Sequence, residues 1–180
     1  LSAAQLTVKG ALSGHNVWTT LHANSAMGAL TRLLDMGVEA FKLKDETMMR
    51  GLVSMRLFKK LCPYCREKLS EKHNHPAYNR VKDAFGYLGL NQVYVRGNGC
   101  EHCNGSGTIG RIKAGEIIMT NSEFLSLALA GDTEGALKYW LEKMNGRTLK
   151  EAAIELMLRG IIGVDELERW VGLLDRPWVY

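Results

Sequence analysis

The sequence predicts an α/β protein with a cysteine module in the middle of the chain and a helical C-terminal part. A β-prone run at 16–22 leads directly into an amphipathic helix pattern that ends at Gly37, as at the flank of an α/β sheet. Two CxxC pairs delimit a module over 62–103. After residue 120, capping signals and glycines separate several short helices, which indicates a small helical bundle.

The composition is that of an ordinary globular chain. Of the 180 residues, 46% are hydrophobic and 23% are charged. No apolar run approaches the roughly 18 residues that a membrane-spanning helix needs, and no secretory signal opens the chain. The net charge of +4 is mild and compels neither a nucleic-acid nor a membrane partner. Because the chain begins with Leu1 rather than Met, we expect it to be a piece of a longer protein.

The N-terminal third is predicted to contain one strand, with helices before and after it in the sequence. Residues 2–13 are predicted to be helical, and the β-branched and aromatic residues of 16–22 favour a strand. Asn24-Ser25 is predicted to cap a helix over 24–36, with Gly37 as its end. The run 39–60, rich in Met and Leu, predicts one long helix or two abutting helices.

The remaining elements are predicted from capping residues, prolines, glycines and the spacing of apolar residues. Residues 76–90 predict a helix, 92–96 a short strand, and 108–119 a bent strand or hairpin. Three further helices are expected to begin at a capping box of Thr120 with Glu123, at Asp132, and at a second capping box of Thr148 with Glu151. An amphipathic pattern over 164–174 predicts the last helix.

All four cysteines lie in the two pairs, Cys62/Cys65 and Cys100/Cys103. A two-residue spacer lets both sulfurs of a pair reach the same ion, so four thiolates can hold one tetrahedral Zn²⁺. Such a closed coordination sphere leaves no position for a catalytic water, so the zinc is expected to be structural. The alternatives are two disulfides or free buried thiols. Three histidines lie near the pairs and could replace a cysteine, but we expect them at the surface: His73, His75 and His102.

Two of the five histidines, His15 and His22, bracket the predicted strand. At about 3.3 Å per strand residue they would lie roughly 20 Å apart, too far to bind one phosphate together. In open α/β sheets, ligands bind at the carboxyl ends of the strands. This rule favours His22 as the ligand-facing residue and leaves His15 structural or interfacial.

The residues around these histidines resemble the histidine box of the hexameric ATPases of type II secretion and type IV pilus biogenesis. The resemblance starts at Ser13-Gly14-His15 and at Thr20-Leu21-His22-Ala23-Asn24, and it runs into 29–39. It extends over nearly the whole chain, through the segments 55–57, 61–65, 99–107, 110–111, 147–151 and 160–167.

The resemblance implies the C-terminal segment of a RecA-like P-loop ATPase core over 1–60, a tetracysteine zinc module over 61–119 and a C-terminal helical domain over 120–180. It also implies ATP with Mg²⁺ in the intact protein, a homo-hexameric ring and an inner-membrane platform protein as partner. The ring would be cytoplasmic and peripherally associated with the inner face of the bacterial inner membrane, with no nucleic-acid partner. By the same resemblance, His22 would contact the γ-phosphate, His15 would support it, and Arg56 would help to bind nucleotide.

Three departures from the family pattern matter. Met55-Arg56-Leu57 stands where the family has Gln-Arg-Leu, and Thr108 stands where it has Tyr. The phosphate-loop pattern GxxxxGK[ST] does not occur in this sequence. We therefore expect a C-terminal part of the motor that does not hydrolyse ATP by itself.

Two other classes of protein remain open from the residues alone. The run Cys100–Gly107 fits the CxxCxGxG repeat of DnaJ-type chaperones, but 62–69 lacks the glycines, and that family carries four repeats. A zinc-ribbon nucleic-acid binder could use the basic region 50–68, although few aromatic residues interleave with its charges. Salt-sensitive binding in a gel-shift assay would favour the latter.

Overall fold

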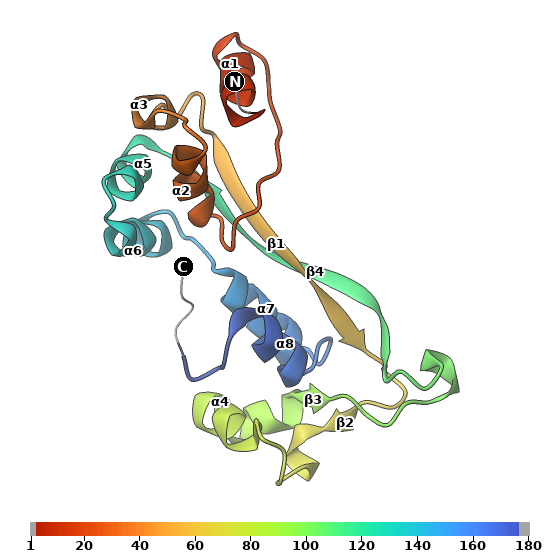
Figure 1. Ribbon diagram of the computed structural model, residues 1–180. Helices are drawn as coiled ribbons and strands as arrows, with labels where there is room; N and C mark the ends of the chain where they lie inside the picture. Colours follow the sequence, from red (N-terminus) through yellow and green to blue (C-terminus); the bar gives the residue numbers. More distant parts are fainter. Residues whose placement is uncertain (1–2, 177–180) are drawn as a thin grey trace. The chain divides into compact units, whose positions relative to one another are not determined.

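A computed structural model describes residues 3–176 and confirms the α/β class, with helices and two small two-stranded sheets (Figure 1). The chain divides into two compact units. Among the described residues, the first comprises 3–54 together with Glu116–Arg147, and the second comprises Met55–Gly115 and 148–176. Strands β1 (Gly51–Leu61) and β4 (Thr108–Met119) pair with each other, and each contributes to both units.

The first unit contains five helices among the described residues, packed around two apolar clusters. These helices are α1 (Ala3–Leu12), α2 (Gly28–Asp35), α3 (Ala40–Leu43), α5 (Ser122–Leu129) and α6 (Thr133–Lys143). In one cluster, buried residues of α1 pack with Leu33 of α2 and Leu43 of α3. In the other, Trp140 of α6 and Phe124 of α5 pack with residues of α2. Leu52 of β1 and Ile118 of β4 belong to the same cluster.

Local chemistry sets the ends of α2. The helix begins at Gly28, a turn later than expected, and its N-cap residue is Met27, whose side chain makes no capping bond. The Ser25 hydroxyl still accepts a hydrogen bond from the Gly28 amide over 3.0 Å. Gly37 has a φ of +81°, a conformation that favours glycine, and the following amide of Val38 bonds back to the Leu33 carbonyl. The predicted helix end at Gly37 is confirmed.

The second unit packs three helices and the small β2–β3 sheet around a third apolar cluster. Its helices are α4 (Tyr78–Gln92), α7 (Leu149–Leu158) and α8 (Val164–Val171). Strands β2 (Glu67–Lys68) and β3 (Tyr94–Val95) are antiparallel, with Glu67 opposite Val95. Short 3₁₀ helices η1 (Leu69–Glu71) and η2 (Glu101–Cys103) follow these strands. Buried residues of the cluster include Phe58, Leu69, Val81, Leu90, Leu149, Met157 and Leu167.

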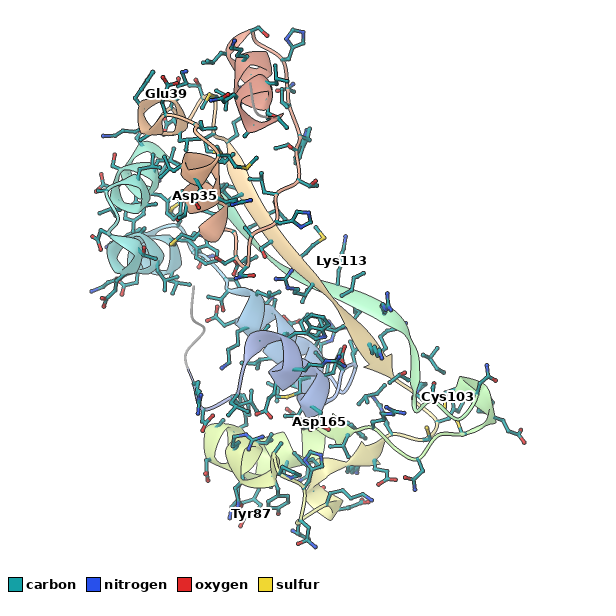
Figure 2. The ribbon with its side chains drawn as sticks, viewed as in Figure 1. Asp35, Glu39, Tyr87, Cys103, Lys113 and Asp165 are labelled. Carbon is teal, nitrogen blue, oxygen red and sulfur yellow. The ribbon has the colours of Figure 1, made fainter. Side chains whose placement is uncertain are left out.

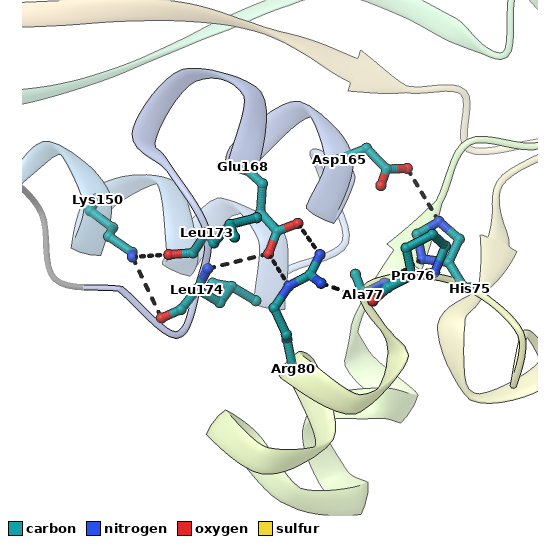
Figure 3. A network of polar contacts seen from close by, with 9 residues as sticks. All are labelled: His75, Pro76, Ala77, Arg80, Lys150, Asp165, Glu168, Leu173 and Leu174. Carbon is teal, nitrogen blue, oxygen red and sulfur yellow. Dashed lines mark hydrogen bonds and ion pairs between the residues drawn. The ribbon is translucent and has the colours of Figure 1, made fainter.

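A polar network holds α4, α8 and the segment after α8 together within the second unit (Figure 3). The Arg80 guanidinium on α4 donates two hydrogen bonds to the Glu168 carboxylate on α8, at 2.8 and 2.6 Å. Glu168 also accepts from the Leu174 amide. The buried Lys150 ammonium donates to the carbonyl groups of Leu173 and Arg176. These bonds fix the residues that follow α8.

The prediction of helix throughout 39–60 is wrong. Only the four residues of α3 are helical there, and 51–61 form strand β1. Methionine and leucine are good helix formers, but exposed Val53, Met55 and Leu57 alternate with buried or half-buried neighbours, which is the period of a strand. Pairing with β4, nearly fifty residues later, overrides the local helix propensity. Residues 108–119 accordingly form one strand and not a hairpin.

The predicted strand over 16–22 is also wrong. Residues 15–23 have no regular secondary structure, and the side chains of 12–20 are exposed. A strand requires a hydrogen-bonded neighbour. Among residues 3–176, the only strand pairs are β1 with β4 and β2 with β3, so the β-prone run has no partner there.

Two of the three predicted caps of the C-terminal helices are confirmed. These helices belong to two different units. Asp132 caps α6, and Thr148 with Glu151 forms the capping box of α7. The cap of α5 is Asn121 rather than Thr120, whose hydroxyl instead donates to the Met49 carbonyl. Helices α5 and α6 belong to the first unit and α7 and α8 to the second. The predicted division into 1–60, 61–119 and 120–180 stays a prediction.

Two further points complete the fold. Within residues 3–176, every helix is too short or too polar to span a bilayer. Of the C-terminal segment 175–180, residues 177–180 lie outside the described residues.

Candidate metal centre

The first cysteine loop directly follows strand β1. The Cys62 amide continues the pairing with β4 by donating to the Gly107 carbonyl over 3.0 Å. The chain then turns, because the amides of Cys65 and Arg66 both donate back to the Cys62 carbonyl. This turn brings the sulfur of Cys65 to the same side as that of Cys62, which is buried.

The second loop precedes β4 and repeats this arrangement (Figure 2). The amides of Cys103 and Gly105 donate to the Cys100 carbonyl at 3.2 and 3.0 Å. Asn104 has a φ of +49°, and Gly105 and Gly107 also have positive φ values, so the chain reverses tightly around Cys103. The positive φ values explain why glycine occupies positions 105 and 107.

The four sulfurs lie close together and none forms a disulfide. The Sγ–Sγ distances are 3.7 Å for Cys62–Cys100, 3.8 Å for Cys65–Cys103 and 3.7 Å for Cys100–Cys103. A tetrahedral site with metal–sulfur bonds of about 2.3 Å has sulfur–sulfur edges of about 3.8 Å. The arrangement therefore has the size and donor set that one thiolate-bound metal ion requires, and the disulfide alternative is wrong.

The loop backbone favours a thiolate at Cys103. Burial alone would raise the pKa of this thiol, but hydrogen bonds from the amides of Cys100 and Gly107 outweigh it and lower the pKa to about 6. By contrast, burial and the neighbouring sulfurs raise the pKa of the Cys65 thiol to about 12. A metal cation binding to all four sulfurs would displace the remaining protons, which couples binding to proton release.

Two contacts outside the ligand set support the loops. The rings of Tyr64 and His102, one from each loop, are stacked with their centroids 3.9 Å apart. Gly97 packs against the first loop so closely that a Cβ atom there would lie 1.7 Å from the Cys65 carbonyl oxygen. The role of Gly97 was not predictable from the sequence, because nothing local distinguishes it from the other glycines of 97–110.

The neighbouring histidines have other partners. His102 stacks on Tyr64, His73 lies against the Tyr78 ring, and His75 faces the Asp165 carboxylate at 3.3 Å. Among the described residues, the four cysteines form the cluster of possible metal ligands, and no histidine belongs to it.

The predicted nucleotide-site residues lie on separate elements. His15 and His22 are exposed in the irregular segment of the first unit, and the Nδ1 atom of His15 lies 2.9 Å from the Ser13 hydroxyl. Arg56 is half buried on β1, in the part that belongs to the second unit. The roles of His15, His22 and Arg56 at a nucleotide stay predictions.

One buried carboxylate was missed at the sequence level. The Glu116 side chain is fully buried on β4, and it accepts a hydrogen bond from the Ala26 amide. A signal was available, because Ala114, Glu116 and Ile118 alternate as one face of a strand.

Taken together, the fold and the cysteine geometry define an α/β protein with a tetracysteine site for one metal ion. Residues 1–169 match the family described as Type II/IV secretion system protein, and the chain belongs to this family.

Named relatives agree with this membership. The chain is 34% identical over 166 residues to a type II secretion system protein E of Klebsiella pneumoniae, which covers 92% of this chain and 31% of that protein. It is 31% identical over 164 residues to the type IV pilus assembly ATPase PilB of Thermus thermophilus, covering 91% of this chain and 18% of PilB. The type II secretion system ATPase E of Vibrio cholerae is 29% identical over 170 residues, which cover 94% of this chain and 32% of that protein. The chain thus spans a third or less of the length of these relatives.

Proposed function

We propose that this chain is the C-terminal part of an ATPase that powers type II protein secretion or type IV pilus assembly by ATP-driven motion of subunits in a ring. The observation that carries the proposal is the family match over residues 1–169. Relatives with this segment are named as a secretion ATPase and a pilus assembly ATPase, and both are much longer than this chain. Neither name favours a DnaJ-type chaperone or a zinc-ribbon nucleic-acid binder.

Within this proposal, the present chain does not hydrolyse ATP alone. Its sequence lacks the GxxxxGK[ST] pattern whose backbone amides and lysine hold the phosphates of ATP. In the intact protein, ATP and Mg²⁺ would bind to the RecA-like core, and residues 1–60 would complete that core.

His22 is proposed to contact the γ-phosphate of ATP, with His15 in support and Arg56 as a further nucleotide-binding residue. A neutral imidazole donates a hydrogen bond to a phosphate oxygen, and a protonated one adds a positive charge. The exposure of His22 supports this role, because its ring is accessible to a ligand.

The tetracysteine site is proposed to hold one structural Zn²⁺. Four thiolates on two loops, with sulfur–sulfur distances near those of a tetrahedron, support zinc as the ion. Because all four ligands come from the protein, this ion would hold the two loops together and would not activate water.

The proposed assembly is a homo-hexamer in the cytoplasm, bound peripherally at the inner face of the bacterial inner membrane. Its partner would be the platform protein of the secretion or pilus machine, and no nucleic acid is involved. Membership of the secretion-system family supports an assembly of several proteins, and the hexamer and the platform protein are proposed from the resemblance to its ATPases.

The test of the proposal is ATP turnover in the longer protein that contains this chain. We expect His22→Ala to lower the turnover rate about 100-fold, since one donor to a developing phosphate charge has an effect of this order. His73→Ala, an exposed histidine against Tyr78, is the matched control and should hydrolyse ATP normally. Unchanged turnover in His22→Ala, with metal content and circular dichroism intact, would contradict the proposed contact of His22 with the γ-phosphate.

A further inference from the structure

Strand β4 carries an acidic side chain in the interior of the first unit. The Glu116 side chain is 0% exposed, and its neighbours on the same face, Ala114 and Ile118, are also buried. Burying a carboxylate is costly unless hydrogen bonds replace its lost hydration. A carboxylate retained at such a position therefore calls for specific hydrogen-bond donors.

One donor is a main-chain amide far away in the sequence. The Ala26 N–H group donates to Glu116 Oε1 over 2.8 Å, across 90 positions of the chain. Ala26 is itself buried, so water does not compete for this bond. A hydrogen bond to an ionised acceptor in a dry environment is stronger than one between neutral groups.

The Ala26 amide stands between an irregular segment and a helix. After Ala26 the chain enters α2, and the Ser25 hydroxyl caps its first amide. Before Ala26, residues 15–23 have no regular secondary structure. Residues 15–23 are in neither a helix nor a strand pair, so any restriction of this segment comes from other contacts, including those of side chains.

Two anchors lie on either side of His22. Leu21 packs against the apolar cluster of α1, α2 and α3 immediately before the histidine. Four residues after it, the Glu116 bond fixes the main chain at Ala26. An exposed histidine between two fixed points has fewer accessible positions than one in a free loop.

We propose that Glu116 is a positioning residue, which holds the segment that carries His22 by binding the Ala26 amide. The proposal rests on the proposed nucleotide contact of His22 for its functional meaning. Glu116 would act through the backbone and not touch the nucleotide.

Amide hydrogen exchange on the 180-residue chain tests the anchor directly. In Glu116→Met, which keeps a long side chain but removes both oxygens, we expect the amides of 22–26 to exchange at least tenfold faster. Glu116→Gln keeps a carbonyl oxygen for Ala26 and should restore exchange to within a few fold of the wild type. The control Glu142→Met removes an exposed carboxylate of α6 in the same unit and should change nothing.

Wild-type exchange rates for 22–26 in Glu116→Met would overturn the proposal, and so would a failure of Glu116→Gln to restore protection. If Glu116→Met instead unfolds the first unit, the exchange rates of two amides in the wild-type chain test the proposal. Its Ala26 amide must exchange at least a hundredfold more slowly than the His22 amide. Comparable rates for the two amides would overturn the proposal.

The functional consequence is measured separately in the longer ATPase. There, Glu116→Met should raise KM for ATP or lower kcat at least tenfold, and Glu116→Gln should rescue the loss. If His22→Ala leaves turnover unchanged while the exchange result holds, the nucleotide role of His22 fails and the anchor stands. If His22→Ala abolishes ATP turnover but Glu116→Met shows wild-type amide exchange and turnover, the positioning role of Glu116 is wrong and the nucleotide role of His22 stands.

Discussion

The sulfur atoms of Cys62 and Cys100 lie 3.7 Å apart, although 38 positions separate these residues in the sequence. The two loops meet because Cys62 directly follows β1, the second loop leads into β4, and the two strands pair. Strand pairing therefore brings the four thiols together before any metal is considered.

Metal content is the first prediction. We expect purified chain to hold one zinc ion, and Cys62→Ser to lower both metal content and the midpoint of thermal unfolding, because three thiolates bind zinc more weakly than four. Elemental analysis with a melting curve measures both. His102→Ala should keep its zinc, since the ring stacks on Tyr64 outside the ligand set. A folded, reduced wild-type chain without stoichiometric metal would contradict the zinc proposal.

The second prediction concerns Gly97. Gly97→Ala should reduce zinc occupancy and stability, because the new Cβ atom would overlap the Cys65 carbonyl oxygen at 1.7 Å and displace the first loop. Competition with a chromogenic chelator measures the affinity for zinc. Gly51→Ala is the matched control, since its Cβ atom would meet its neighbours at an ordinary 3.5 Å. Equal zinc affinity in the two variants would show that the first loop tolerates displacement.

The third prediction concerns the Arg80–Glu168 pair. Arg80→Ala should lower the free energy of unfolding by about 2–3 kcal/mol, because it leaves the buried Glu168 carboxylate without its bidentate donor. Urea denaturation measures this loss. The exposed pair Arg159–Glu155 offers a control, and Arg159→Ala should cost less than about 1 kcal/mol. Losses of similar size in both variants would mean that burial does not strengthen the Arg80 pair.

The fourth prediction concerns pH. Burial lowers the pKa of Lys150 below its ordinary value of 10.5, against the opposing effect of Asp175 and Glu168. The folded chain thus releases this proton at a lower pH than the unfolded chain does. Between the two pKa values the unfolded state binds more protons, so this residue makes the free energy of unfolding rise with pH.

Lys150→Met removes this contribution. We expect the stability of the wild type relative to Lys150→Met to increase as the pH is raised from 8 toward 10.5, measured by urea denaturation at each pH. Lys138→Met, at an exposed position on α6, should track the wild type over the same range. A constant difference between the wild type and Lys150→Met would contradict the lowered pKa.

Features that depend on neighbours in the sequence were predictable. Asp132 and the Thr148–Glu151 box bond to amides three residues away, and Gly37 ends its helix through its own φ. The cysteine pairs are local in the same sense, since two residues of spacing let both sulfurs of a pair reach one ion.

The strands were not predictable in this way. The β-prone run at 16–22 has no strand partner among residues 3–176, whereas 51–61 become a strand despite their Met and Leu content. In both cases the decision depends on whether a distant segment offers hydrogen bonds, and single-sequence propensity contains no such information.

The sequence by itself determined which four cysteines could bind one metal ion, the resemblance to secretion ATPases and most helix ends, because each follows from residue type and short spacing. Only the tertiary structure decided that β1 pairs with β4, that Gly97 backs the Cys65 loop and that Glu116 holds the Ala26 amide. These contacts join residues 32 to 90 positions apart, and packing of the whole unit selects them.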